Sequence, residues 1–225
     1  MINPPAKLKR KAQRVHSILL RTYGEPRWTR LDGVSELVAT ILSQNTNDNN
    51  RDLAYSRLRA RFPTWEAVRD ADPQAVIEAI RPAGLANQKG PRIQAALRHI
   101  TNSHGQLSLD FLADLPLEEG RAWLTSIHGV GLKTASIVLL FCYGKPAFPV
   151  DTHVHRVTGR LGLRDAQLNA DQTHYWMEAL CQSGWHGPLH LNLIRLGREV
   201  CQSRTPQCAH CPLRRLCDHA KHHTP

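Results

Sequence analysis

Apolar residues along this chain recur about every three to four positions, the spacing that places them on one face of an α-helix. Leu37, Val38, Ile41 and Leu42 form one such stripe. No convincing run alternates between apolar and polar residues as a half-buried strand does. The pattern therefore predicts an all-α protein built from short helices. We expect these helices near Val15, over 37–42, 53–62, 65–68, 75–80, 93–100, 107–115, 118–126, 132–143, 152–161 and 172–182, and from Pro188 to Val200.

Residues that favour helix ends lie just before or just after several of these apolar runs. Ser35, Thr64 and Asp171 stand just before apolar runs, where a side-chain oxygen can cap the first free N–H groups of a helix. Gly144 follows the run 132–143 and suits a helix C-terminus. These signals predict where several helices begin and end.

A two-glycine turn, Gly129-Val130-Gly131, leads directly into the apolar run 132–143. Glycine permits tight turns and close approach of another backbone. The first N–H groups of a helix are unpaired and carry partial positive charge, so such a turn can hold a phosphate. A plain corner between two packed helices is the alternative. Lys133 falls in the first turn of this expected helix, and Asp151 opens the next one.

The balance of charge strengthens the phosphate interpretation. The chain has 29 Lys and Arg against 19 Asp and Glu, a formal net charge of +10. Such an excess favours a polyanionic partner, although a merely solvated basic surface is the alternative. No apolar run reaches the length of a membrane span, and the basic N-terminus lacks the apolar core of a secretory signal. We therefore expect a cytoplasmic protein.

Two further stretches suit contact with bases. The amide-rich run 43–50, which includes Gln44 and Asn45, directly follows the stripe 37–42 and could hydrogen-bond base edges. A solvated turn is the alternative. Leu85 lies on a loop beside Gly84, where an apolar side chain could wedge between bases or could simply turn into the core.

Cysteines gather near the C-terminus. Six are present, and four of them follow the spacing C-x6-C-x2-C-x5-C within 17 residues, namely Cys201, Cys208, Cys211 and Cys217. In a reducing compartment clustered cysteines more often bind metal than form disulfides. The spacing alone leaves a [4Fe–4S] cluster, zinc and free thiols open. Cys142 and Cys181 lie in helical patterns and are expected to be core residues.

At this point the sequence resembles the endonuclease III family of DNA glycosylases, in the helix-hairpin-helix superfamily. The resemblance rests on residues 127–135, 150–157 and 84–89 and on the four-cysteine spacing, and it covers roughly 30–217. It implies two α-helical domains flanking a DNA-binding cleft. One is a six-helix domain over 31–145 that carries the hairpin. The other joins 1–30 to 146–225 and holds the C-terminal cluster loop.

The resemblance also assigns roles to residues. It places Lys133 and Asp151 at the catalytic lysine and aspartate, and it implies a [4Fe–4S] cluster on the four cysteines. Ile127-His128 stands where the family usually has Leu-Pro, and either Gln44 or Asn45 fills the position of its amide wedge. We expect DNA contacts at Gly129, Val130, Gly131, Thr134, Leu85, Lys89, Gln44 and Asn45.

The activity that the resemblance implies is a bifunctional DNA glycosylase/AP lyase of base excision repair. It would remove oxidised pyrimidines from double-stranded DNA and nick 3′ to the abasic site by β-elimination, as a monomer associated with a bacterial nucleoid. A mismatch-specific adenine or thymine glycosylase is one alternative, although such relatives generally lack a lysine at position 133. A non-catalytic DNA-binding metalloprotein is another.

Overall fold

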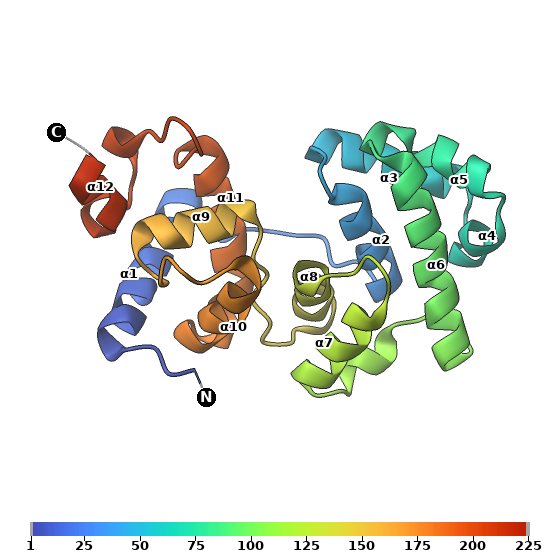
Figure 1. Ribbon diagram of the computed structural model, residues 1–225, viewed down its shortest axis with the longest axis horizontal. Helices are drawn as coiled ribbons and strands as arrows, with labels where there is room; N and C mark the ends of the chain where they lie inside the picture. The colour runs from blue at the N-terminus through green and yellow to red at the C-terminus, as the bar shows by residue number, and fades with distance from the viewer. Residues whose placement is uncertain (1, 224–225) are drawn as a thin grey trace. The chain divides into compact units, whose positions relative to one another are not determined.

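The computed structural model describes residues 2–223, and every regular element in that range is helical (Figure 1). The expected all-α class is therefore confirmed. The chain divides into two compact units, one running from Arg30 to Lys145 and the other formed by the residues before Arg30 and from Pro146 onward. This boundary differs from the expected 30/31 division by one residue. Arg30 belongs with the continuous unit, where its Nε donates to the Cys142 carbonyl at 2.9 Å.

The continuous unit, from Arg30 to Lys145, packs around its longest helix, α6. This helix contacts α2, α4 and α5, and α8 packs against α2 and α7 (Figure 1). The elements are α2 (Gly33–Ser43), α3 (Asp48–Arg61), α4 (Trp65–Asp70), α5 (Pro73–Ile80), α6 (Ala86–His104), α7 (Leu117–Ser126) and α8 (Leu132–Tyr143), with 3-10 turns η1 (Arg81–Ala83) and η2 (Asp110–Ala113).

The discontinuous unit joins α1, near the N-terminus, to the helices that follow Pro146. Here α11 contacts both α1 and α9, and α10 contacts the same two helices. The elements are α1 (Ala6–Tyr23), α9 (Thr152–Leu161), α10 (Ala170–Leu180), α11 (His186–Glu199) and α12 (Asp218–His223), with 3-10 turns η3 (Ser183–Trp185), η4 (Cys208–His210) and η5 (Arg214–Leu216).

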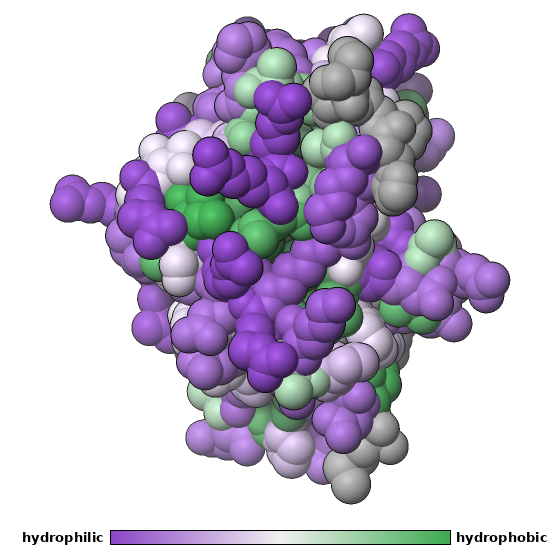
Figure 2. Space-filling view, turned by 90° about the vertical axis from the view of Figure 1, so that its left-hand side faces the viewer, coloured by the Kyte–Doolittle hydropathy of each residue, from purple (hydrophilic) through white to green (hydrophobic). Residues whose placement is uncertain are grey.

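Apolar stripes build the core of each unit in the way the sequence pattern predicts. In the continuous unit Ile41, Ile93 and Leu139 are at most 1% exposed. In the discontinuous unit Val15 and Leu193 are fully buried. The side of the molecule shown in Figure 2 is largely hydrophilic, with small apolar areas between the polar side chains. Cys142 and Cys181 are buried, which confirms their expected place in the cores.

Several helix boundaries differ from the sequence prediction. Asp32, not Ser35, caps α2, and Ser35 instead donates its backbone N–H to the Asp32 carboxylate at 2.9 Å. Asn169, not Asp171, caps α10 through a reciprocal pair of bonds with Gln172. Asp and Asn both accept well at this position, so each helix is capped by a suitable side chain two or three residues before the predicted one. Helix α11 begins before Pro188, which lies in its first turn.

Two predicted helices have a different extent. The run 107–115 forms only the 3-10 turn η2, and the Lys145 ammonium donates to the carbonyls of Ala113 (2.5 Å) and Leu115 (2.7 Å) at its end. Helix α6 extends well beyond 93–100 and contains Pro91. Among the residues described, no helix is long and apolar enough to cross a membrane.

Candidate functional site

The Gly-Val-Gly turn lies between α7 and α8 of the continuous unit, and its two glycines serve different purposes. Gly129 has φ +85°, and a Cβ there would lie 3.1 Å from the Arg92 side chain. Gly131 caps α8 with the extended φ of −94°, and a Cβ there would meet no atom within 4 Å. Gly129 therefore shapes the turn, whereas Gly131 leaves open space at the mouth of α8.

The first turn of α8 is the part of the hairpin that offers hydrogen-bond donors. No side chain caps this helix, so its first N–H groups face outward as an anion site would require. Lys133 in the same turn is half-buried. Val130 and Thr134 are only 5% and 4% exposed. The Val130 N–H already donates to the Ile127 carbonyl at 3.0 Å, so of these two residues only Thr134 keeps a backbone N–H that could contact DNA.

The amide-rich run meets the hairpin. The Gln44 side-chain nitrogen lies 3.5 Å from the Gly129 carbonyl oxygen, at the limit of a hydrogen bond. Asn45 is exposed and has φ +51°, a conformation that Asn tolerates better than most residues. Asn47 caps α3 by accepting the Asn50 N–H at 2.9 Å. The structure thus brings Gln44 beside the turn and leaves the neighbouring amide of Asn45 in solvent.

Leu85 is exposed rather than turned into the core. Its residue is 49% exposed, and its backbone has the left-handed φ of +49°, directly after Gly84 at φ +65°. A left-handed leucine is strained by roughly 1–2 kcal/mol. An apolar side chain held out in solvent on strained backbone is a common mark of a functional site.

Lys89 was expected to contact DNA, and its position corrects that expectation. The residue is 1% exposed, and its ammonium donates to the carbonyls of Leu42 and Ala83, at 2.8 Å each. Burial lowers the pKa of this ammonium. A side chain enclosed in this way cannot reach a phosphate, so Lys89 acts within the fold.

Asp151 belongs to the discontinuous unit, where it caps α9. Its carboxylate accepts the Val154 N–H at 2.7 Å. Three buried histidines hold the segment just before it by donating to consecutive backbone carbonyls. The pairs are His186 to Ala147 (3.1 Å), His174 to Phe148 (2.9 Å) and His190 to Pro149 (2.9 Å). Sequence reasoning missed these histidines because an isolated histidine on an apolar helix face matches no motif.

The four C-terminal cysteines line one small cavity in the same unit. Its other lining residues are Val200, Pro206, Gln207, His219 and Ala220. Burial raises the pKa of Cys211 to about 11, and the charges of the other three thiols act in the same direction. Within the described residues, no three His, Cys, Asp or Glu side chains converge closely enough to share a metal ion. Four thiols around one cavity nevertheless fit the donor set of a cluster.

Arginines from α9 hold the cysteine loop in place. Arg160 donates to the carbonyls of Gln202 (2.6 Å) and Ser203 (2.7 Å), and its own carbonyl accepts the Cys217 thiol at 3.3 Å. Arg156 donates to the Cys201 carbonyl at 3.1 Å. Nothing in the sequence indicated these two arginines, because they lie some 40 residues before the loop in the chain.

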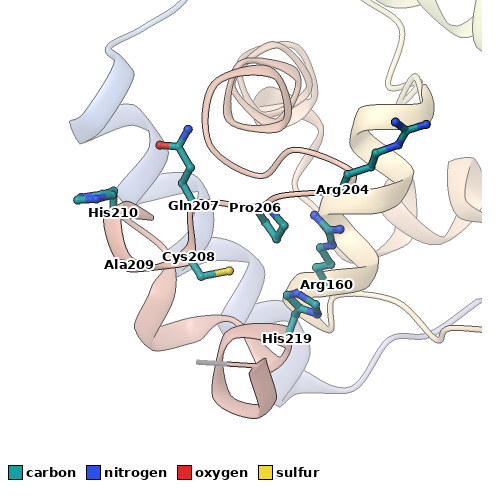
Figure 3. Close-up of a pocket in the computed structure, with 8 residues that line it drawn as sticks. All are labelled: Arg160, Arg204, Pro206, Gln207, Cys208, Ala209, His210 and His219. Carbon is teal, nitrogen blue, oxygen red and sulfur yellow. The ribbon is translucent and has the colours of Figure 1, made fainter. Parts of the chain in front are cut away.

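A wider depression opens beside this loop. Figure 3 shows Arg160, from α9, and Arg204 on one side of it, with His219 from α12 nearby. The Cys208 sulfur points toward its middle, whereas His210 points away. Two arginines therefore lie on one side of the depression that the Cys208 thiol faces. The hairpin, Gln44, Leu85 and Lys133 belong to the continuous unit, and Asp151 and the four cysteines belong to the discontinuous one.

Comparison with known proteins adds to this geometry. Residues 38–183 match the family described as HhH-GPD superfamily base excision DNA repair protein. An endonuclease III of Sulfolobus acidocaldarius is 36% identical over 183 residues, which cover 80% of this chain and 79% of that protein. An endonuclease III of Thermotoga maritima is 32% identical over 182 residues, covering 81% of each.

Solved structures resemble the fold as a whole. A trapped covalent intermediate of endonuclease III and DNA has a TM-score of 0.82 at 25% identity, with 95% of this chain and 97% of that chain covered. A thermostable thymine-DNA glycosylase has a TM-score of 0.80 at 24% identity, with 97% and 100% covered. The second likeness bears on the fold alone.

Proposed function

The chain belongs to the HhH-GPD superfamily of base excision DNA repair proteins and is an endonuclease III-like DNA glycosylase; we propose that it is bifunctional, removing oxidised pyrimidines and then cutting the strand as an AP lyase. The observation that carries this proposal is Lys133, which stands in the first turn of α8 directly after the glycine hairpin. A monofunctional glycosylase needs only a water nucleophile, whereas an amine at this position can bond to the sugar.

The proposed reaction begins with extrusion of the damaged nucleotide, which costs a few kcal/mol and least for a poorly stacked lesion. The neutral amine of Lys133 attacks C1′, the N-glycosidic bond breaks, and the base leaves with the bonding electrons and takes up a proton. The sugar ring opens to give a Schiff base between Nζ and C1′. Loss of a C2′ proton then expels the 3′ phosphate oxygen, which is β-elimination.

Asp151 would stabilise positive charge at the sugar and assist proton movement around the amine. Its carboxylate also caps α9, so the two roles need separate tests. Asn caps as well as Asp does, and it carries no charge. We expect Asp151→Asn to keep the thermal unfolding midpoint close to that of the wild type while lowering the single-turnover rate about 100-fold. Equal rates for the variant and the wild type would exclude Asp151 from catalysis.

DNA contacts in this proposal come mostly from the continuous unit. The backbone N–H groups at Gly131 and the start of α8 would bind a phosphate, and Leu85 would enter the duplex. Gln44 or Asn45 would occupy the gap that the extruded base leaves. The exposure of Asn45 supports its role, whereas Gln44 already lies against the hairpin carbonyl.

The two hairpin glycines form a matched pair of substitutions. Gly129→Ala forces a Cβ onto a positive-φ position against Arg92, so we expect it to destabilise the protein by about 1–2 kcal/mol. Gly131→Ala meets no atom of the protein, so stability should stay unchanged while the new methyl group blocks the phosphate and weakens DNA binding. Urea unfolding and binding titrations on one abasic duplex would separate the effects. Normal DNA affinity for Gly131→Ala would contradict the phosphate site.

We further propose that Cys201, Cys208, Cys211 and Cys217 hold a [4Fe–4S] cluster. Four thiols lining one cavity support this donor set, and Arg160 secures the loop that carries them by donating to the Gln202 carbonyl. When bound, the cluster would supply iron–thiolate bonds that tie the loop together. Nothing in the glycosidic chemistry needs an electron, so its role in this proposal is structural.

A panel of damaged duplexes tests the proposed activity. Thymine glycol, adenine opposite 8-oxoguanine and a G·T mismatch would each be assayed for base release and for strand nicking, with borohydride present in parallel to reduce a Schiff base. We expect release, nicking and a covalent adduct on thymine glycol. Release from the mismatches without nicking would favour a mismatch-specific glycosylase instead. Salt-sensitive binding without any cleavage would indicate a DNA-binding metalloprotein.

A further inference from the structure

Lys89 is a buried cation with no acidic partner. Among the described residues it forms no ion pair, and its ammonium is enclosed against two backbone carbonyls, those of Leu42 and Ala83. A buried charge is costly unless it is compensated, and neutral carbonyls compensate it only in part. A neutral apolar side chain at this position would cost less free energy of desolvation, so the role of Lys89 depends on the two carbonyls that it binds.

The first acceptor ends helix α2. The last four carbonyls of this helix each receive a donor: Thr40 from the Ser43 hydroxyl, Ile41 from the Gln44 N–H, Ser43 from the Thr46 N–H, and Leu42 from Lys89. Lys89 is the one donor in this set that comes from elsewhere in the chain. A cation there is also favoured by the helix dipole. Lys89 thus fixes the point at which α2 gives way to Gln44 and Asn45.

The second acceptor ends the turn η1. The Ala83 carbonyl stands immediately before Gly84 and Leu85, which follow each other with φ +65° and +49°. Asn45 and Leu85 are the two non-glycine residues with positive φ in the described part of the chain. Each lies two or three residues after a carbonyl that Lys89 holds. The Lys89 ammonium therefore connects the backbone just before both strained loops.

We propose that Lys89 is a positioning residue, which locks the Gln44–Asn45 loop and the Leu85 loop to each other so that both enter the duplex as one rigid unit. This inference rests on the proposed function, since it takes these loops to be the parts that extrude the base. Strained conformations persist only when their surroundings hold them, and the shared ammonium is that support. Lys89 itself touches neither DNA nor the reacting atoms.

Gln94 offers a matched control within the same unit. It is also 1% exposed, and its side-chain amide donates to the carbonyls of Val68 (3.0 Å) and Ala71 (2.8 Å), at the end of α4. It thus secures a loop that carries none of the proposed DNA contacts. Lys89→Met and Gln94→Met each remove a buried donor and leave a side chain of similar length. If Lys89 only stabilised the fold, both variants should change the rates on paired and unpaired lesions in the same way.

The experiment compares one thymine-glycol strand in two settings. It is either fully paired or placed in a short bubble of mismatches, where the lesion is already unpaired and extrusion is easy. We expect Lys89→Met to lose about tenfold or more in single-turnover rate on the paired strand relative to the bubble. Gln94→Met should keep the wild-type ratio within about twofold. Should Lys89→Met fail to fold, Lys89→Gln is measured by the same ratio.

Hydrogen exchange provides a second measurement. The Thr46 and Gln88 amides, which close the two loops, should exchange faster in Lys89→Met than in the wild type and should be unchanged in Gln94→Met. The positioning role would be wrong if Lys89→Met lost the same factor in single-turnover rate on paired and on bubble DNA. It would also be wrong if amide exchange in either loop matched that of the wild type. A wild-type protein that cleaves neither substrate would instead refute the proposed function.

Discussion

Lys133→Gln is expected to abolish strand cleavage, by about 10³-fold or more in single-turnover rate. Glutamine keeps a polar side chain of similar length in the first turn of α8, but its amide nitrogen cannot bond to C1′. Because the hairpin backbone is untouched, DNA binding should stay within a few-fold of the wild type. The measurement is nicking of a thymine-glycol duplex, with borohydride trapping followed on a denaturing gel.

The charge that this variant loses needs its own control. Lys9, an exposed residue of α1, can be changed to Gln to remove the same charge without touching the hairpin. We expect Lys9→Gln to nick and cross-link as the wild type does. If Lys133→Gln still formed the borohydride adduct, another amine would be the nucleophile and the proposed role of Lys133 would be wrong.

Replacement of one cluster ligand should have the largest effect on stability. We expect Cys211→Ser to reduce bound iron from about four atoms per chain to near zero and to remove the brown colour. Loss of a metal centre is among the few changes that destabilise a protein by on the order of 4 kcal/mol or more. The loop from Cys201 to Cys217 has little regular structure beyond short 3-10 turns, so few other interactions would replace the iron–thiolate bonds.

The buried cysteines outside the loop supply the comparison. Cys142→Ser and Cys181→Ser remove thiols from the two cores, and both variants should keep full iron content and colour. Iron analysis, visible absorption and thermal unfolding would be measured on all three proteins. A colourless wild-type protein that contains zinc would contradict the proposed cluster while leaving the four ligands in place.

Much of the fold and of the candidate site could be predicted from residues that are close together in the sequence. Helical spacing predicted the all-α class, and the two glycines of the hairpin marked the turn before α8. The place of Leu85 beside Gly84 marked it as a candidate wedge or core residue, and the structure shows that it is exposed. Each of these features depends on residues close together in sequence, where backbone preferences and capping act directly.

Features that depend on tertiary contacts escaped prediction. Lysines are almost always exposed, so nothing in the sequence around Lys89 indicated that two distant carbonyls would enclose it. Helix α6 was predicted too short because Gly90 and Pro91 normally discourage helices. The structure needs Gly90 there, because a Cβ would lie 2.9 Å from Ile77 of α5. In both cases a neighbouring element outweighed the local preference.

The discontinuous unit also has a consequence for biosynthesis. Helix α1 is synthesised before the continuous unit, but α10 and α11, against which it packs, are made only after that unit. Val15 and Leu19 therefore remain without their partners while residues 30–145 are translated. During that interval the lysines and arginines of α1 repel other copies of the chain and so oppose aggregation through the exposed apolar stripe.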